Sequence, residues 1–378
     1  MASFIFVPLN GYNTISMSKT FESAWINEIK KRYEKRPIFQ QPALYRVAVL
    51  PEWEEKRVAI ENLVSCFAEE QQHEIIQHIR NPDLFLTTYN ELIAGDIIKA
   101  YGHTLEYERP LGEKTPDWRV HTTEGGKDLI VEVVTIMPPK DIQAEIRAWN
   151  ELRYRIQNIE HYFHLYMSAR PTKAIIGKDI KAIVRFVQNW LSTFDLNTPP
   201  DNEELIYKDN DLIITFKLIN RKTSHKRSVG VAGPEFTQWV NSDLLRNAIS
   251  KKLTKYREAK EAHLPLINAV FPSFESGLSI DSLLDVLFGN EQVSVATGQV
   301  SRSRKGMILP QIQQGQIFLK NTRLSAILFV EQTNPQTIKM IHNPYAQDPV
   351  NPRIFQGIEH FTITAKDEIK YIMDWVSF

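Results

Sequence analysis

Residues 114–135 read KTPDWRVHTTEGGKDLIVEVVT, and this stretch decides the expected fold. One strand is expected over residues 117–121 and a second over residues 128–136. Gly125 and Gly126 lie between them, where glycine supplies the positive φ that a tight hairpin turn needs. The second strand is almost entirely apolar and β-branched, which is typical of a strand buried on both faces. The stretch therefore predicts a β-hairpin inside a covered sheet.

Two carboxylates mark this hairpin. Glu132 interrupts the apolar strand, and Asp117 opens the strand before it, where the hairpin brings the two side by side. A buried charge costs several kcal/mol unless it is paired or binds a metal. The pair therefore suggests a site. A simpler interpretation also stands, in which Asp117 opens a turn and Glu132 faces solvent at a sheet edge.

The bulk composition bounds the class of protein. The chain has 378 residues, 43% hydrophobic and 24% charged, which is typical of one large globular domain or two ordinary ones. Its formal net charge is zero, so nucleic-acid binding would need charges segregated along the chain. The single cysteine excludes a disulfide framework and Cys-based zinc sites. Without a long apolar run or a basic signal-peptide start, we expect a cytoplasmic protein without membrane contact.

Three regions are expected along the chain. Residues 1–80 form a helical extension, residues 81–200 form the core, and residues 201–378 form a C-terminal α/β elaboration packed on that core. The core begins with a helix that carries Glu91 on an apolar or small face, so this carboxylate is expected to be shielded from water. Three strands, a helix and a strand at residues 161–168 follow, which gives the order α-β-β-β-α-β.

The motifs TPDW and IVEVV, in this order of elements, resemble the PD-(D/E)xK nuclease superfamily. The resemblance implies an α/β fold with a central mixed sheet flanked by helices. It matches Asp117 to the first acid, Glu132 to the second and Glu91 to the helix acid. It further implies that Asp117, Glu132 and the main-chain carbonyl of Val133 bind Mg²⁺ or Mn²⁺ for phosphodiester hydrolysis in DNA or RNA.

One position departs from the superfamily pattern. Side chains two apart on a strand share a face, so Val134 stands where the motif lysine belongs. Valine carries no charge, and removing one such donor typically costs about 10²–10³ in rate. We expect a cation from the helix over residues 241–261 instead. The segments KKLTKY and LPLINAV resemble a widespread bacterial branch in which the lysine four before a tyrosine matches Lys252, the fourth expected catalytic residue.

A basic segment could hold the nucleic-acid backbone. Residues 217–260 contain eleven Lys and Arg against three acids, an excess of about eight positive charges within a neutral chain. The expected phosphate contacts are Arg221, Lys222, Lys226, Arg227, Lys251 and Lys255. A solvated hairpin tip remains the alternative for the loop at residues 221–227.

Three functions follow from these patterns, the last of which is a protein-interaction scaffold that acts through its helical N-terminus. The first is a metal-dependent nuclease acting on nucleic acid, DNA in the first place, which by analogy would serve restriction or phage defence. Its expected partners are a second copy of the chain or a protein of the same defence system. Val134 keeps a second function open: an inactive nuclease-fold subunit that binds nucleic acid or assembles with other proteins.

Overall fold

The hairpin lies in a mixed sheet of eight strands, ordered β1-β2-β3-β8-β13-β14-β15-β16. Its strands are β1 (Thr104–Tyr107), β2 (Trp118–His121), β3 (Leu129–Ile136), β8 (Leu266–Pro272), β13 (Leu324–Glu331), β14 (Thr337–His342), β15 (Glu359–Lys366) and β16 (Tyr371–Ser377). The expected class, α/β with a large mixed sheet flanked by helices, is confirmed.

This computed structural model describes residues 19–37, 40–123, 127–159, 164–171, 177–194, 203–209, 212–219, 228–231, 242–255, 263–273, 276–289, 291–296, 299–304, 306–309, 311–313, 316–331, 337–366 and 371–377. The expected hairpin turn at Gly125 and Gly126 lies outside these residues, as does the basic loop with Arg221, Lys222, Lys226 and Arg227. No described helix is both long enough and apolar enough to cross a membrane.

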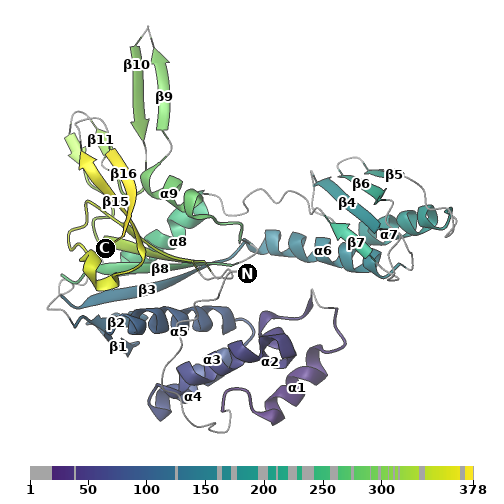
Figure 1. Ribbon diagram of the computed structural model, residues 1–378, viewed down its shortest axis with the longest axis horizontal. Helices are drawn as coiled ribbons and strands as arrows, with labels where there is room; N and C mark the ends of the chain where they lie inside the picture. The colour runs from purple at the N-terminus through teal and green to yellow at the C-terminus, as the bar shows by residue number, and fades with distance from the viewer. Residues whose placement is uncertain are drawn as a thin grey trace. The chain divides into compact units, whose positions relative to one another are not determined.

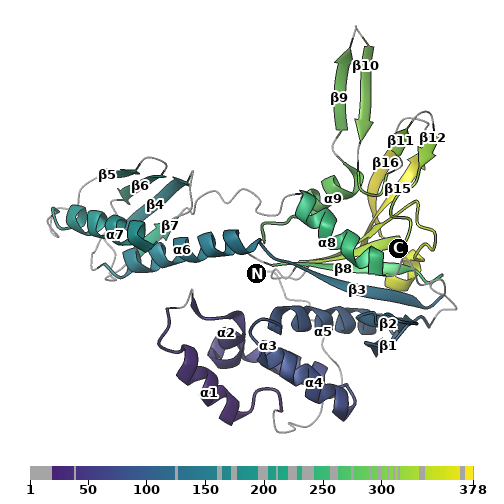
Figure 2. The same cartoon turned by 180° about the vertical axis from the view of Figure 1, so that it is seen from behind.

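Helices cover both faces of the large sheet (Figures 1 and 2). One face packs on α2 (Ala43–Val49), α3 (Glu54–Ser65), α4 (Glu69–Arg80) and α5 (Phe85–Ala100). The other face packs on α8 (Ser242–Lys255) and α9 (Ile280–Phe288). The central strands β3, β8 and β13 are therefore buried on both sides, which explains their nearly continuous apolar sequences.

The strand pairing explains where the site forms. β2 and β3 are antiparallel, with Trp118 opposite Val131, and β3 runs parallel to β8. Continuing the β2–β3 register by one residue sets Asp117 opposite Glu132. Alternate residues share a face, so Ile130 and Val134, which pack in the cluster under α8, place Glu132 on the α8 face.

The chain divides into two compact units, and their boundaries differ from the expected ones. One unit comprises Met1–Ile26, Ala43–Met137 and Val240–Phe378, and the other comprises Asn27–Pro42 and Pro138–Trp239. Within residues 201–378, expected as an elaboration packed on the core, the strands β8, β13, β14, β15 and β16 belong to the sheet that contains the hairpin. The helices α2–α4, expected as a helical extension, bury apolar side chains in the same cluster as α5, β2 and β3.

The sheet to which the strand expected at residues 161–168 belongs also differs from the expectation. The strand forms as β4 (His164–Pro171) but lies in the second unit, in a four-stranded sheet ordered β5-β6-β4-β7. The other strands there are β5 (Glu204–Asp209), β6 (Leu212–Ile219) and β7 (Ser228–Val231), and the helices are α6 (Lys140–Gln157) and α7 (Gly177–Leu191). β4 buries Leu165 and Met167 against these helices, so β8 takes the place beside β3.

The remaining described elements lie outside these two sheets. They are α1 (Ser23–Tyr33), the 3₁₀ turns at Pro51–Trp53 and Pro352–Phe355, and two short hairpins formed by β9 (Glu291–Ala296) with β10 (Gln299–Arg304) and by β11 (Gln311–Gln313) with β12 (Gln316–Phe318).

Candidate active site

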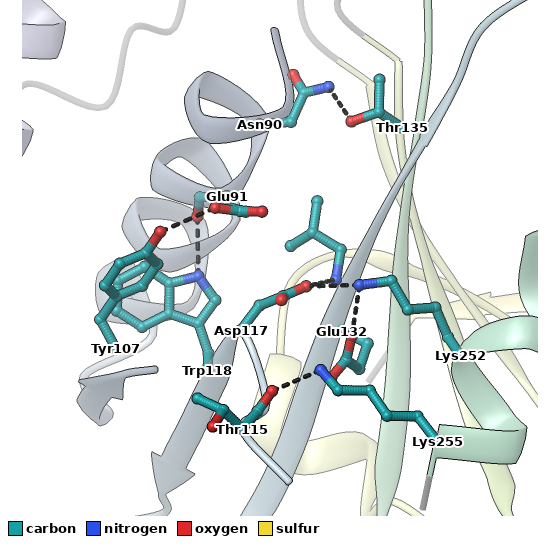
Figure 3. A network of polar contacts seen from close by, with 11 residues as sticks. Asn90, Glu91, Tyr107, Thr115, Asp117, Trp118, Glu132, Thr135, Lys252 and Lys255 are labelled. Atoms are coloured by element: carbon teal, nitrogen blue, oxygen red, sulfur yellow. Dashed lines mark hydrogen bonds and ion pairs between the residues drawn. The ribbon is translucent and has the colours of Figure 1, made fainter. Parts of the chain in front are cut away.

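A cluster of acids and lysines forms where β2 and β3 face α8 (Figure 3). Lys252 Nζ donates to Asp117 Oδ2 at 3.2 Å and to Glu132 Oε2 at 2.5 Å. Lys255 Nζ donates to the other oxygen of Glu132, Oε1, at 2.8 Å and also to the carbonyl of Thr115. One ammonium group therefore bridges the two carboxylates, and a second one binds the more buried of the two.

The backbone of β3 fixes the orientation of Asp117. The Val133 N–H donates to Asp117 Oδ2 at 2.6 Å, just beyond the point where β2 pairing with β3 ends. In an extended strand the N–H and C=O groups of one residue point to the same side. The Val133 carbonyl is therefore directed to the same edge of β3 as Asp117.

The lysines reach the site because α8 packs its apolar stripe on the sheet. Leu245, Ile249 and Leu253 are buried four residues apart, and this orientation sets Lys252 and Lys255 beside the stripe. The Glu132 side chain is fully buried, whereas Lys252 keeps 28% and Lys255 keeps 31% of its side chain exposed. The opening of the site is therefore on the lysine side.

The expected replacement for the motif lysine thus lies at the carboxylates. Val134 follows Glu132 on the same face of β3 and is buried among the apolar side chains under α8. A lysine at that position would place its charge in an apolar cluster, which is costly. Lys252 reaches the acids from the neighbouring helix without crossing that cluster.

Glu91 approaches the acids from the α5 face of the sheet (Figure 3). The Tyr107 hydroxyl donates to Glu91 Oε2 at 2.8 Å, and the Trp118 indole N–H donates to the Glu91 main-chain carbonyl at 2.8 Å. These two contacts tie α5 to β1 and β2. Gly95, one turn further along, packs so closely on the Trp118 ring that any Cβ there would clash.

Burial and neighbouring charges shift the pKa values of Glu91, Asp117 and Lys252 in this cluster. Burial, with the negative charge of Asp117 second, raises the pKa of Glu91 to about 7. Burial and then Glu132 raise the pKa of Asp117, against the opposing effects of Lys252 and the Val133 N–H. For Lys252, burial alone would lower the pKa, but the carboxylates of Asp117 and Glu132 outweigh it and raise it. Lys252 is therefore a protonated cation at neutral pH.

The residues of this cluster can be compared with the ligands that the expected divalent cation needs. Among the described residues, no group of three or more His, Cys, Asp or Glu side chains is arranged to hold a metal ion. Asp117 and Glu132 nevertheless share one cation, the Lys252 ammonium group, and both offer the hard oxygen atoms that Mg²⁺ and Mn²⁺ prefer. The two acids and the Val133 carbonyl are the oxygen donors that would hold such an ion in place of the ammonium group.

The structure thus brings Glu91, Asp117, Glu132 and Lys252 into one region and adds residues that the motifs do not mark. Lys255, expected on the nucleic-acid backbone, donates to Glu132 in this structure, since it lies three positions after Lys252 on the same side of α8. Tyr107 carries no motif signal. Lys251, the remaining expected phosphate contact in the described residues, is exposed on α8.

Comparison of the chain with protein-family models, with curated proteins and with solved structures finds no match.

Proposed function

We propose that the chain is a metal-dependent nuclease of the PD-(D/E)xK type that hydrolyses phosphodiester bonds in DNA or RNA. The observation that carries the proposal is the bridging contact of Lys252 with both Asp117 and Glu132. Two acids on neighbouring strands and a lysine are the groups that this chemistry needs, and here the lysine comes from α8 in place of β3.

The acids and one backbone carbonyl would form the cation site. A pair of carboxylates that already holds one positive charge between them can exchange it for a metal ion. Asp117, Glu132 and the Val133 carbonyl would be the protein ligands. A divalent cation bound by them would activate water and neutralise the charge that builds on the phosphoryl oxygens.

Lys252 would act as a donor and not as a base. Its raised pKa keeps the ammonium group charged at neutral pH, so it can stabilise negative charge but cannot accept a proton. With the two acids neutralised by a metal, the Lys252 ammonium group would be free to turn to the substrate phosphate. Lys255 can follow the same course, since it is bound to the same carboxylate.

Glu91 is suited to exchange a proton near neutral pH. Its pKa of about 7 lies close to the working pH, where a general acid or base is most effective. The Tyr107 hydroxyl holds its carboxylate in place. We propose that Glu91 orients a water molecule or a ligand of the cation.

Substrate binding would use the basic end of α8, where Lys251 is exposed. The loop that contains Arg221, Lys222, Lys226 and Arg227 supports this proposal by its sequence alone. A role in restriction or phage defence, with a second copy or a defence-system protein as partner, remains a proposal by analogy.

The charge balance favours a second candidate function. Lys252 and Lys255 together neutralise Asp117 and Glu132, and Val134 is apolar. If the lysines never leave the acids, no cation enters. The chain would then be a catalytically inactive subunit that binds nucleic acid or assembles with a partner.

A cleavage assay separates the two candidates. Labelled single- and double-stranded DNA and RNA are incubated with the protein and either Mg²⁺, Mn²⁺ or EDTA. The nuclease proposal expects cation-dependent cleavage that Asp117→Asn and Glu132→Gln abolish. Asp128→Asn is the matched control, because this acid lies on the same hairpin but bonds Arg119. Cleavage that survives both site substitutions would exclude the mechanism, and salt-sensitive binding without cleavage would support the inactive subunit.

A further inference from the structure

Strand β8 carries one polar side chain among apolar ones. It reads LINAVFP, and Asn268 is fully buried. Leu266 and Val270, two residues to either side, pack in the apolar cluster under α8. Asn268 therefore lies on the α8 face of the sheet, which is the face that carries Glu132.

The register sets Asn268 directly beside Glu132. The two residues are paired in the parallel ladder between β3 and β8. Neighbouring strands lie about 4.8 Å apart, so side chains on one face of such a pair adjoin each other. On its other side Asn268 is paired with Ile327 of β13. Of its two cross-strand neighbours, Glu132 alone is polar.

Among the described residues, no group forms a hydrogen bond with either end of the Asn268 side-chain amide, its Nδ2 or its Oδ1. A buried amide without partners costs stability, and most buried polar side chains in native proteins are bonded. A valine or isoleucine would continue the pattern of β8 without that cost. The position therefore keeps a donor beside Glu132 that the resting arrangement of the two lysines does not use.

We propose that Asn268 is a positioning residue for Glu132. In this structure Lys252 and Lys255 each donate a hydrogen bond to one of the two carboxylate oxygens of Glu132. If these ammonium groups leave Glu132 for a bound phosphate, the Asn268 Nδ2–H group would donate to the carboxylate and hold it in the orientation that binds the cation. This inference rests on the proposed function, because it needs the state in which the lysines leave Glu132.

Metal affinity separates this role from a purely structural one. Partners that hold a metal ligand in place typically contribute 10- to 100-fold to metal affinity. Asn268→Val and Asn268→Thr have nearly the same shape, and threonine alone keeps a hydroxyl donor. Titration calorimetry of the full chain with MnCl₂ should give about 10- to 100-fold weaker binding for the valine variant. The threonine variant should bind more tightly than the valine variant.

A matched control addresses packing. Ile327→Val changes the same layer on the other side of Asn268 and should leave Mn²⁺ affinity unchanged. Urea unfolding is measured in parallel, and Asn268→Val should keep or raise the unfolding midpoint because it removes an unpaired buried amide.

The outcomes distinguish the inference from the function on which it rests. If the folded wild type binds no Mn²⁺, the proposed nuclease function fails and the role of Asn268 fails with it. If the wild type binds Mn²⁺ and Asp117→Asn does not, but the valine and threonine variants bind as the wild type does, only the role of Asn268 is overturned.

Discussion

The buried carboxylate of Glu91 should make the stability of the protein depend on pH in a definable window. Its pKa rises from the ordinary value of 4.5 to about 7, chiefly through burial and then through Asp117. The folded state therefore keeps a proton that the unfolded state has released, and stability falls as pH rises from about 4.5 to about 7. Each pH unit in this window is worth about 1.36 kcal/mol, so Glu91 costs on the order of 3 kcal/mol above it.

Glu91→Gln removes this cost with little change in shape. The amide keeps an oxygen that accepts from the Tyr107 hydroxyl, but it cannot ionise. Urea unfolding at pH 5, 6, 7 and 8 should show the variant more stable than the wild type by under about 1 kcal/mol at pH 5 and about 3 kcal/mol at pH 8. Glu70→Gln, at an exposed position on α4, is the control and should show no such trend. A stability difference between Glu91→Gln and the wild type that is the same at pH 5 and pH 8 would refute the reasoning.

Three further predictions concern the first unit. Lys252→Met leaves the acids without their bridging cation and should cost about 2–4 kcal/mol at pH 7 by urea unfolding. This loss should shrink toward pH 4 as Asp117, whose pKa is raised, becomes protonated; an equal loss at both pH values would contradict it. Burial and then His360 lower the pKa of His342 from 6.5 to about 4, so stability should fall by about 3 kcal/mol as pH falls through that range. His342→Gln should flatten that fall in acid unfolding curves, and an unchanged curve would exclude the effect. Gly95→Ala should lower the thermal midpoint, because a Cβ there overlaps the Trp118 ring and overpacking costs about 1–3 kcal/mol; an unchanged midpoint would argue against this packing.

Local patterns in the sequence locate most of the site. The apolar run of β3 with one acid, and the Pro-Asp pair before it, predict a buried hairpin, and hairpin register alone sets Asp117 beside Glu132. The substitution at Val134 indicates that a cation must come from elsewhere. The resemblance of KKLTKY to a bacterial branch then implies Lys252, which the structure places at both acids.

Non-local pairing is what the sequence could not show. β3 pairs with β8 across more than a hundred residues, while the nearer strand β4 joins another sheet. β4 alternates buried and exposed side chains whereas β8 is nearly all apolar, but neither local pattern predicts which strand it pairs with. The position of Asn268 beside Glu132 follows only from that register, because an asparagine in an apolar strand does not by itself predict a role. The bond between Lys255 and Glu132 likewise depends on how α8 is rotated on the sheet.

The most direct test of the central claim is a crystal structure of the protein soaked in MnCl₂, read at the manganese anomalous edge. The nuclease proposal predicts a peak that contacts both Asp117 and Glu132, with Lys252 Nζ moved away from Glu132. A structure without a peak there, in which Lys252 still bridges the two acids at saturating Mn²⁺, would contradict the claim that this site holds the cation.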